Sequence, residues 1–167
     1  MVQQDVQLRS EVFRQDVEKM ARWMADEEVT EYLNEEQNID HELRSLLDRS
    51  PLPVYSPHFN RDGCFFLVTL PDDGPIGFVR LVPKRDQAEI VVVIGERSHW
   101  CNGYGCQAIR KAARHAFFEW RKERMVATIH RGNHRSQKVF QKAGFAEKEK
   151  LATETRFTLP VERFLQH

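Results

Sequence analysis

The chain has 167 residues, of which 41% are apolar and 30% are charged, and its 25 lysines and arginines balance its 25 aspartates and glutamates. This length and composition predict a single domain over residues 1–167, and the zero formal net charge disfavours a nucleic-acid-binding protein. No apolar run approaches the roughly 20 residues of a membrane helix, and the first residues lack an apolar signal core, so we expect a cytoplasmic protein without a membrane partner. Cys64, Cys101 and Cys106 form no C-x-x-C pair, and we interpret them as free thiols.

The first third of the chain changes from a strand period to a helix period. Apolar residues alternate over residues 6–13, which predicts a strand, and then recur at helical spacing over 17–24 behind Asp16, a residue type that caps helices. A second helical pattern covers residues 39–47. Residues 50–63 contain three prolines and end in Asp-Gly, which predicts a loop.

The rest of the chain predicts a sheet with two further helices. Short polar turns separate three apolar runs, which predict strands at 64–70, 76–82 and 89–95. One face of residues 105–120 is apolar, which predicts an amphipathic helix. The remaining elements are a strand at 125–130, a helix at 134–144 and a hairpin at 145–160. The order β-α-α-β-β-β-α-β-α-β-β is typical of an α+β fold in which helices pack against a sheet.

A loop with two glycines joins the strand at 89–95 to the long helix. The first N–H groups of a helix lack partners and the helix dipole is positive there, so Gly103 and Gly105 predict an anion site. The pattern G-x-x-x-x-G-K-[ST] is absent, and Ala108 stands where G-x-G-x-x-G requires its third glycine. The Walker and dinucleotide-binding motifs are therefore excluded.

Two segments together resemble the GNAT N-acetyltransferases. HWCNGYGCQAIRKAARHAFFEW (99–120) is similar to the family's acetyl-coenzyme A loop and helix, with the pattern [QR]-x-x-G-x-[GA], although Trp100 replaces the Gln or Arg. NHRSQKVFQKAGF (133–145) is similar to its N-x-x-[AS]-x-x-x-[YFL]-x-x-x-G-F segment. The element order resembles the family over nearly the whole chain, which implies a mixed, mostly antiparallel sheet flanked by helices. With Trp100 and Ser136 at these positions, the motifs resemble those of the branch that includes the ribosomal-protein N-terminal acetyltransferases RimJ and RimL. This branch also contains antibiotic, polyamine and amino-sugar acetyltransferases.

The resemblance implies acetyl-coenzyme A as co-substrate and direct acetyl transfer to a primary amine in a ternary complex. In the family, the pantetheine arm pairs with the backbone at the end of the fourth strand, and N–H groups of the loop hold the pyrophosphate. The residues that would bind the cofactor are Val92, Val93, Ile94, Cys101, Asn102, Gly103, Tyr104, Gly105, Cys106, Asn133 and Ser136. The alternative is that Gly103 and Gly105 only form a turn and Asn133 only caps a helix.

The resemblance also implies catalytic candidates. An amine must lose a proton to become a nucleophile, so a base is useful. Glu89 lies on the strand where the family often has a carboxylate that takes this proton through water, and Glu96 is a second candidate. Either can instead be a solvated carboxylate. Many family members protonate the leaving thiolate with a tyrosine, but Phe140 occupies that position, and Ser136 is the nearest hydroxyl of the motif.

Acidic residues suggest the acceptor. Residues 26–36 contain six acids and no lysine or arginine, and by family analogy Glu27, Glu28 and Glu31 would attract a cationic amine. The alternative is a solvated helix face. Tyr55 and Phe59 in the long loop would cover the acceptor or pack against the sheet.

Several functions stay open at this point. Protein N-termini, polyamines, aminoglycosides and amino sugars all remain as acceptors, and an acyl-coenzyme A sensor or interaction module without turnover is the alternative to an enzyme. Gly132 and Asn133 interrupt any helix between His130 and His134, so we expect no metal site. We expect a monomer or a homodimer.

Overall fold

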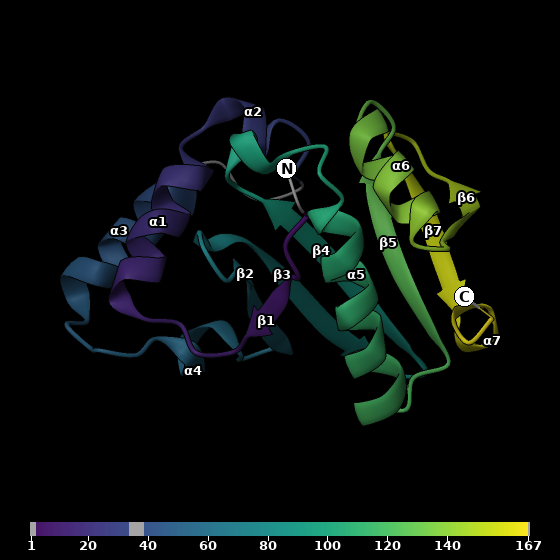
Figure 1. Ribbon diagram of the computed structural model, residues 1–167, viewed down its shortest axis with the longest axis horizontal. Helices are drawn as coiled ribbons and strands as arrows, with labels where there is room; N and C mark the ends of the chain where they lie inside the picture. Colours follow the sequence, from purple (N-terminus) through teal and green to yellow (C-terminus); the bar gives the residue numbers. More distant parts are fainter. Residues whose placement is uncertain (1–2, 34–38, 167) are drawn as a thin grey trace.

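The computed structural model describes residues 3–33 and 39–166 (Figure 1). Its strands are β1 (Gln7–Arg9), β2 (Cys64–Leu70), β3 (Gly74–Lys84), β4 (Gln87–Ile94), β5 (Arg124–His130), β6 (Ala146–Lys150) and β7 (Glu154–Pro160). Its helices are α1 (Arg14–Met24), α2 (Glu27–Thr30), α3 (Ile39–Arg49), α4 (Ser56–Phe59), α5 (Tyr104–Arg114), α6 (His134–Lys142) and α7 (Val161–Phe164). A 3-10 turn, η1 (Arg97–His99), precedes α5, and a π-helical turn, η2 (His115–Glu119), follows it. No helix in the described part of the chain is long and apolar enough to cross a membrane.

The strands form one seven-stranded sheet in the order β1-β2-β3-β4-β5-β7-β6. Within this sheet only the β4–β5 pair is parallel. The predicted α+β class with a mixed, mostly antiparallel sheet is confirmed.

Several predicted elements differ from the structure in their bounds. The predicted strand at 6–13 is reduced to the three residues of β1. Helix α1 begins at Arg14, and Asp16 is its third residue rather than its N-cap, because the Asp16 carboxylate accepts a hydrogen bond from the N–H of the N-cap residue Phe13 (2.8 Å). The predicted loop at 50–63 contains α4, and the predicted helix at 105–120 changes to π-helical geometry after Arg114.

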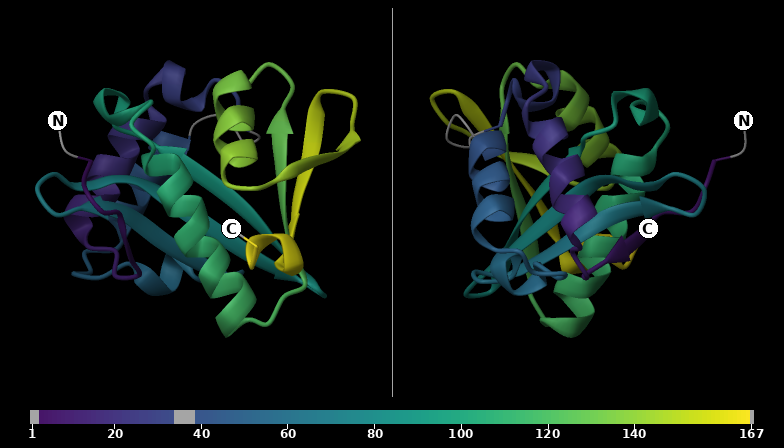
Figure 2. Two further views of the ribbon diagram at one scale, coloured as in Figure 1. Left: turned by 45° about the vertical axis from the view of Figure 1, so that its right-hand side comes forward. Right: turned by 90° about the vertical axis from the view of Figure 1, so that its left-hand side faces the viewer.

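Helices cover both faces of the sheet. Helices α5 and α6 pack on one face against side chains such as Val79 and Ile90, and α1 and α3 pack on the other against Phe65 and Leu67 (Figures 1 and 2). Successive strand residues point to opposite faces, so the continuous apolar run of β4 places Ile90 and Val93 in different layers. A strand buried on both faces needs this composition.

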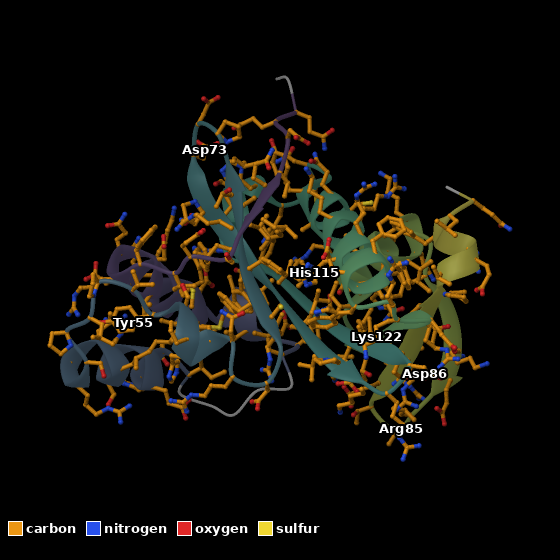
Figure 3. The ribbon with its side chains drawn as sticks, turned by 90° about the horizontal axis from the view of Figure 1, so that it is seen from below. Tyr55, Asp73, Arg85, Asp86, His115 and Lys122 are labelled. Atoms are coloured by element: carbon orange, nitrogen blue, oxygen red, sulfur yellow. The ribbon has the colours of Figure 1, made fainter. Side chains whose placement is uncertain are left out.

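The parallel pairing of β4 and β5 is short. It runs from the Gln87–Arg124 pair to the Glu89–Val126 pair. Next to this paired end, Lys122 Nζ donates to the carbonyl of Arg85 (2.7 Å) and the Glu123 N–H donates to the carbonyl of Asp86 (2.7 Å). Figure 3 shows Arg85, Asp86 and Lys122 together at this end. The two strands are thus fixed together at one end and separate toward the other.

Buried Asp16 predicts a large effect on stability. Its side chain is 3% exposed and accepts hydrogen bonds from two Arg9 nitrogens (2.9 and 3.1 Å) and from the Phe13 N–H. Asp16→Ala leaves these donors without their acceptor, so we expect the free energy of unfolding to fall by about 2–3 kcal/mol. Glu18→Ala removes an exposed pair with Arg14 (3.8 Å) and should cost under about 0.5 kcal/mol. If the two variants lowered the free energy of unfolding equally in chemical denaturation, the stabilising role of Asp16 would be contradicted.

Candidate active site

The backbone of β4 is exposed to the space where β5 diverges. The N–H of Gly95 donates to the carbonyl of Ile76 (2.8 Å), and Ile94 is registered opposite Gly77. In an antiparallel pair this pattern directs the N–H and C=O of Ile94 away from β3, and by alternation those of Val92 as well. These groups therefore face the space between β4 and β5.

Three cavities adjoin the end of β4. The loop cavity, of about 310 Å³, lies between the end of β4, residues 100–106 and α6. The strand opening, of about 460 Å³, lies between β4 and β5. The helix cavity, of about 260 Å³, lies on the sheet face that α1 and α3 cover, between these helices, α4 and β3. Leu33 lines all three, so a molecule in one can approach a molecule in another.

The residues predicted to bind a cofactor gather around the loop cavity. All of them line it except Asn102, which is exposed and whose carbonyl accepts a hydrogen bond from Gln3 Nε2 (2.6 Å). Asn133 also accepts from the N–H of Ser136 (3.1 Å) and caps α6, so the capping alternative holds together with a place in the cavity wall.

The local backbone and packing also require glycine at both loop positions. Gly103 is the N-cap of α5 with φ 83°, a conformation that L side chains rarely adopt. A Cβ on Gly105 would lie 3.2 Å from Val139 Cγ1, so the absence of a side chain lets α5 approach α6. The turn interpretation is therefore correct as far as it goes, and the same turn leaves the first N–H groups of α5 beside the loop cavity.

The N-terminal segment holds the start of α5. Gln107 Nε2 donates to the carbonyl of Gln4 (3.1 Å), and Gln107 Oε1 accepts from the N–H of Val6 (2.9 Å). The N–H of Gln4 lies 3.4 Å from the hydroxyl oxygen of Tyr104. These contacts join residues about 100 positions apart and have no local signature in the sequence.

Trp100 connects the loop to its surroundings. Its Nε1 donates to the carbonyl of Ile94 (2.7 Å), and the Arg135 guanidinium lies 3.5 Å from the centroid of its ring system. Arg135, Lys138 and Lys142 also line the loop cavity, where they add positive charge near the α5 N-terminus. Sequence reasoning missed these three residues, although their spacing of three and four predicts one face of α6.

The catalytic candidates separate clearly. Glu89 lines the strand opening and forms an ion pair with Lys84 (3.1 Å), and Ser136 and Phe140 line both the strand opening and the loop cavity. Glu96 lines none of the three cavities, because it accepts a hydrogen bond from Trp23 Nε1 (2.9 Å). Of the two carboxylates, only Glu89 is in the site.

Two aromatic side chains that sequence reasoning did not assign also line the strand opening. His130 Nδ1 accepts a hydrogen bond from the Gly132 N–H (3.0 Å), so a neutral His130 carries its proton on Nε2. Its ring packs against Tyr32 with a centroid distance of 5.1 Å. Tyr32 lines the loop cavity as well.

The predicted acceptor residues are scattered. Phe59 lines the helix cavity, whereas Glu27 and Glu31 are exposed and line none of the cavities. Glu28 lines the loop cavity and pairs with Arg97 (2.9 Å), which also pairs with Asp26 (2.8 Å). The two carboxylates raise the pKa of Arg97 above its ordinary value, so the cation is permanent.

The interpretation of Tyr55 as a substrate residue is wrong. Tyr55 is 2% exposed in the layer beneath α1 and α3, where its hydroxyl donates to the carbonyl of Ser50 and accepts from Arg14 (3.0 Å; Figure 3). The prolines predicted a loop, and the backbone of this loop also bonds to the segment between β1 and α1, where the Tyr55 N–H donates to the Val12 carbonyl (2.7 Å).

The walls of the helix cavity are mainly apolar. Met20, Met24 and Leu43 line it, with His58 and Arg61 among its polar residues. Burial lowers the pKa of His58, and the charges of Arg61 and Arg49 lower it further, so His58 is neutral at pH 7.

Cys64 Sγ lies 3.7 Å from His115 Nε2, and neither residue lines any of the three cavities. Burial raises the pKa of Cys64, which favours the unreactive thiol, and all three cysteines are free. Among residues 3–33 and 39–166, no three His, Cys, Asp or Glu side chains gather in a way that could hold a metal ion.

Comparisons with known proteins agree with this geometry. Residues 8–146 match the family described as acetyltransferase (GNAT) domain. No curated protein sequence matches the chain. Similar solved structures include a spermidine N-acetyltransferase from Vibrio cholerae in complex with CoA and spermine, which is 18% identical with a TM-score of 0.79 and with 96% of this chain and 98% of that chain covered.

Two further structures have the same fold. A GNAT-family acetyltransferase from Bacillus anthracis is 18% identical with a TM-score of 0.76, covering 97% of this chain and 98% of that one. The aminoglycoside acetyltransferase AAC(6')-Ib in complex with coenzyme A is 14% identical with a TM-score of 0.78, covering 96% and 98%.

Proposed function

Because the chain belongs to the GNAT acetyltransferase family, we propose that it transfers the acetyl group of acetyl-coenzyme A directly to a primary amine while both substrates are bound. The observation that carries this proposal is the exposed backbone of β4 where β5 diverges, beside a cavity that ends at a helix N-terminus. A long cofactor with an amide-containing arm and a pyrophosphate needs both features in one groove.

Coenzyme A would lie along the loop cavity. N–H groups at residues 103–106 and the cations Arg135 and Lys138 would bind the pyrophosphate. The amides of the pantetheine arm would pair with the backbone of Val92, because the Ile94 carbonyl already accepts from Trp100. The thioester would then lie where the three cavities meet.

Glu89 is the base that the geometry supports best. Its side chain shares the sheet face of Val91, which lines the helix cavity where the amine would enter. Val92 lies three steps along the strand from Glu89, which is about 10 Å at roughly 3.3 Å per residue. The amine proton would therefore reach Glu89 through water.

The acceptor is an amine whose class stays open. Neighbouring folds include enzymes for polyamines and aminoglycosides, which favours a cationic amine, and the RimJ/RimL-like motifs favour a protein N-terminus. Arg97 neutralises part of the acidic segment, leaving Glu27 and Glu31 as the exposed acids of α2 and the residue after it. A sensor that binds acetyl-coenzyme A without turnover is the second candidate, because Phe140 cannot donate a proton.

The loop assignment predicts the effect of a charge at Gly103. Gly103→Asp places a carboxylate beside the expected pyrophosphate and should weaken binding of coenzyme A about 100-fold or more, measured by calorimetry. Gly74→Asp is a matched control, because Gly74 also has positive φ (69°) and lies outside all three cavities. Unchanged binding in folded Gly103→Asp protein would overturn the assignment.

The role of Glu89 predicts a pH-dependent loss of rate. Glu89→Gln should lower kcat about tenfold or more at pH 6, where few amines are neutral, and less at pH 9. Cofactor affinity should stay unchanged. Glu96→Gln, at a carboxylate outside the cavities, should keep kcat within about twofold. If both variants match the wild type across this range, the base is solvent.

An acceptor screen tests the function itself. Thiol release from acetyl-coenzyme A should rise over the acceptor-free rate with at least one of four amines: a polyamine, an aminoglycoside, an amino sugar or a peptide with a free N-terminus. A cationic acceptor drawn by Glu27 and Glu31 should show a higher KM as the Debye length falls from about 10 Å at 0.1 M salt to about 3 Å at 1 M. Tight cofactor binding without thiol release under any condition favours the sensor.

A further inference from the structure

The departing thiolate of coenzyme A needs a proton, and two hydroxyl groups are in position to supply it. Among the described residues, those that line both the loop cavity and the strand opening are Tyr32, Leu33, Val92, Asn133, Ser136 and Phe140. Of these only Tyr32 and Ser136 carry a hydroxyl. A phenol is a far stronger acid than an alkyl alcohol. Resting on the proposed function, we propose that Tyr32 is the general acid that protonates the coenzyme A sulfur.

The ring of Tyr32 is held on one side by two residues at the end of β5. It packs against the His130 ring at 5.1 Å with an interplanar angle of 33°. A Cβ on Gly132 would lie 3.1 Å from Tyr32 Cε1 and 3.3 Å from His130 Nδ1, so glycine leaves room for both rings. The Gly132 N–H in turn fixes His130 through its hydrogen bond to Nδ1 (3.0 Å). A side chain at position 132 would push against the Tyr32 ring, so the glycine is part of what allows the ring to pack there.

The segment before Tyr32 is also fixed. Asp26 caps α2 by accepting from the Glu28 N–H (3.0 Å), and Val29 is buried in the layer under α1. Arg97 in η1 bridges Asp26 and Glu28, which ties α2 to the chain that leads into the glycine loop. Figure 1 and both views of Figure 2 place α2 and α6 at the same end of the molecule. Two of the acids in the 26–36 segment thus hold the short helix that precedes Tyr32.

The proposed step balances as follows. The amine nitrogen bonds to the thioester carbonyl carbon, and the C–S bond then breaks with its electron pair leaving on sulfur. The Tyr32 O–H proton moves to that sulfur, giving free coenzyme A, and the phenolate recovers a proton from water. The attacking amine is neutral, and as the amide forms its nitrogen loses one proton through water to Glu89, which releases it to the solvent that reprotonates Tyr32. The products are the acetylated amine and the thiol.

The decisive measurement needs no acceptor. A hydroxyl that donates to the bound thiolate stabilises it, so the thiol of coenzyme A bound to the wild type should have an acid dissociation constant about tenfold larger than when bound to Tyr32→Phe. The ultraviolet absorbance of the thiolate, titrated with pH in the binary complex, reports this. Tyr32→Phe retains every other charged or ionisable side chain that lines the loop cavity or the strand opening among the described residues. These are Glu28, Arg80, Glu89, His99, Cys101, Tyr104, Cys106, His130, Arg135, Lys138 and Lys142.

Two further variants separate chemistry from packing. Tyr55→Phe removes the same atom from a buried tyrosine outside the cavities and should leave the thiol titration unchanged. Gly132→Ala keeps the Tyr32 hydroxyl but displaces the ring, and should give an intermediate shift. With an acceptor present, Tyr32→Phe should lower kcat about tenfold with both KM values unchanged.

Each result decides between the proposals. If coenzyme A binds and its thiol titrates alike in wild type and Tyr32→Phe, Tyr32 is not the acid and the cofactor site stands. The same shift in Ser136→Ala alone would transfer the role to Ser136. If coenzyme A fails to bind the wild type, the proposed function fails, and the Tyr32 proposal with it.

Discussion

The arrangement of the site depends on the early end of one strand pairing. Beyond the Glu89–Val126 pair, β4 and β5 are no longer in register, yet β4 remains paired with β3 as far as Ile94. Backbone N–H and C=O groups are costly to leave without partners when they are buried. The free edge of β4 therefore requires water or a ligand with complementary amides, and the polar contacts at Arg85 and Asp86 hold the two strands together at their paired end.

Under the proposed function, β4 would lie between the cofactor and the amine. The backbone groups of Val92 lie in the sheet plane and face the opening, while the side chains of Val91 and Val93 line the helix cavity on one face. Under the proposed function, the cofactor would lie along the edge of β4 and the amine would approach from that face of the sheet. The proposed direct transfer needs only that the two substrates meet beside Val92.

Much of this fold can be predicted from local patterns, and the exceptions have physical reasons. β2 has its predicted bounds, because seven apolar-rich residues lie between two turn signals. Helices α2, α4 and α7 were not predicted, since a single helical turn is too short to show a 3.6-residue period. Tyr55 was misplaced because prolines indicate an irregular backbone but not whether the side chain is buried.

Only those residues of the site that belong to contiguous sequence motifs could be predicted. Gly103 and Asn133 belong to such motifs, and the structure places both beside the loop cavity. Tyr32 and His130 are nearly 100 residues apart and meet because α2 is bonded to η1 while β5 ends at His130. A residue whose position is set by two long-range contacts leaves no periodic trace. Phe140 occupies the position where many family members have a tyrosine, and the acid that we propose in its place, Tyr32, lies in a segment that neither contiguous motif includes.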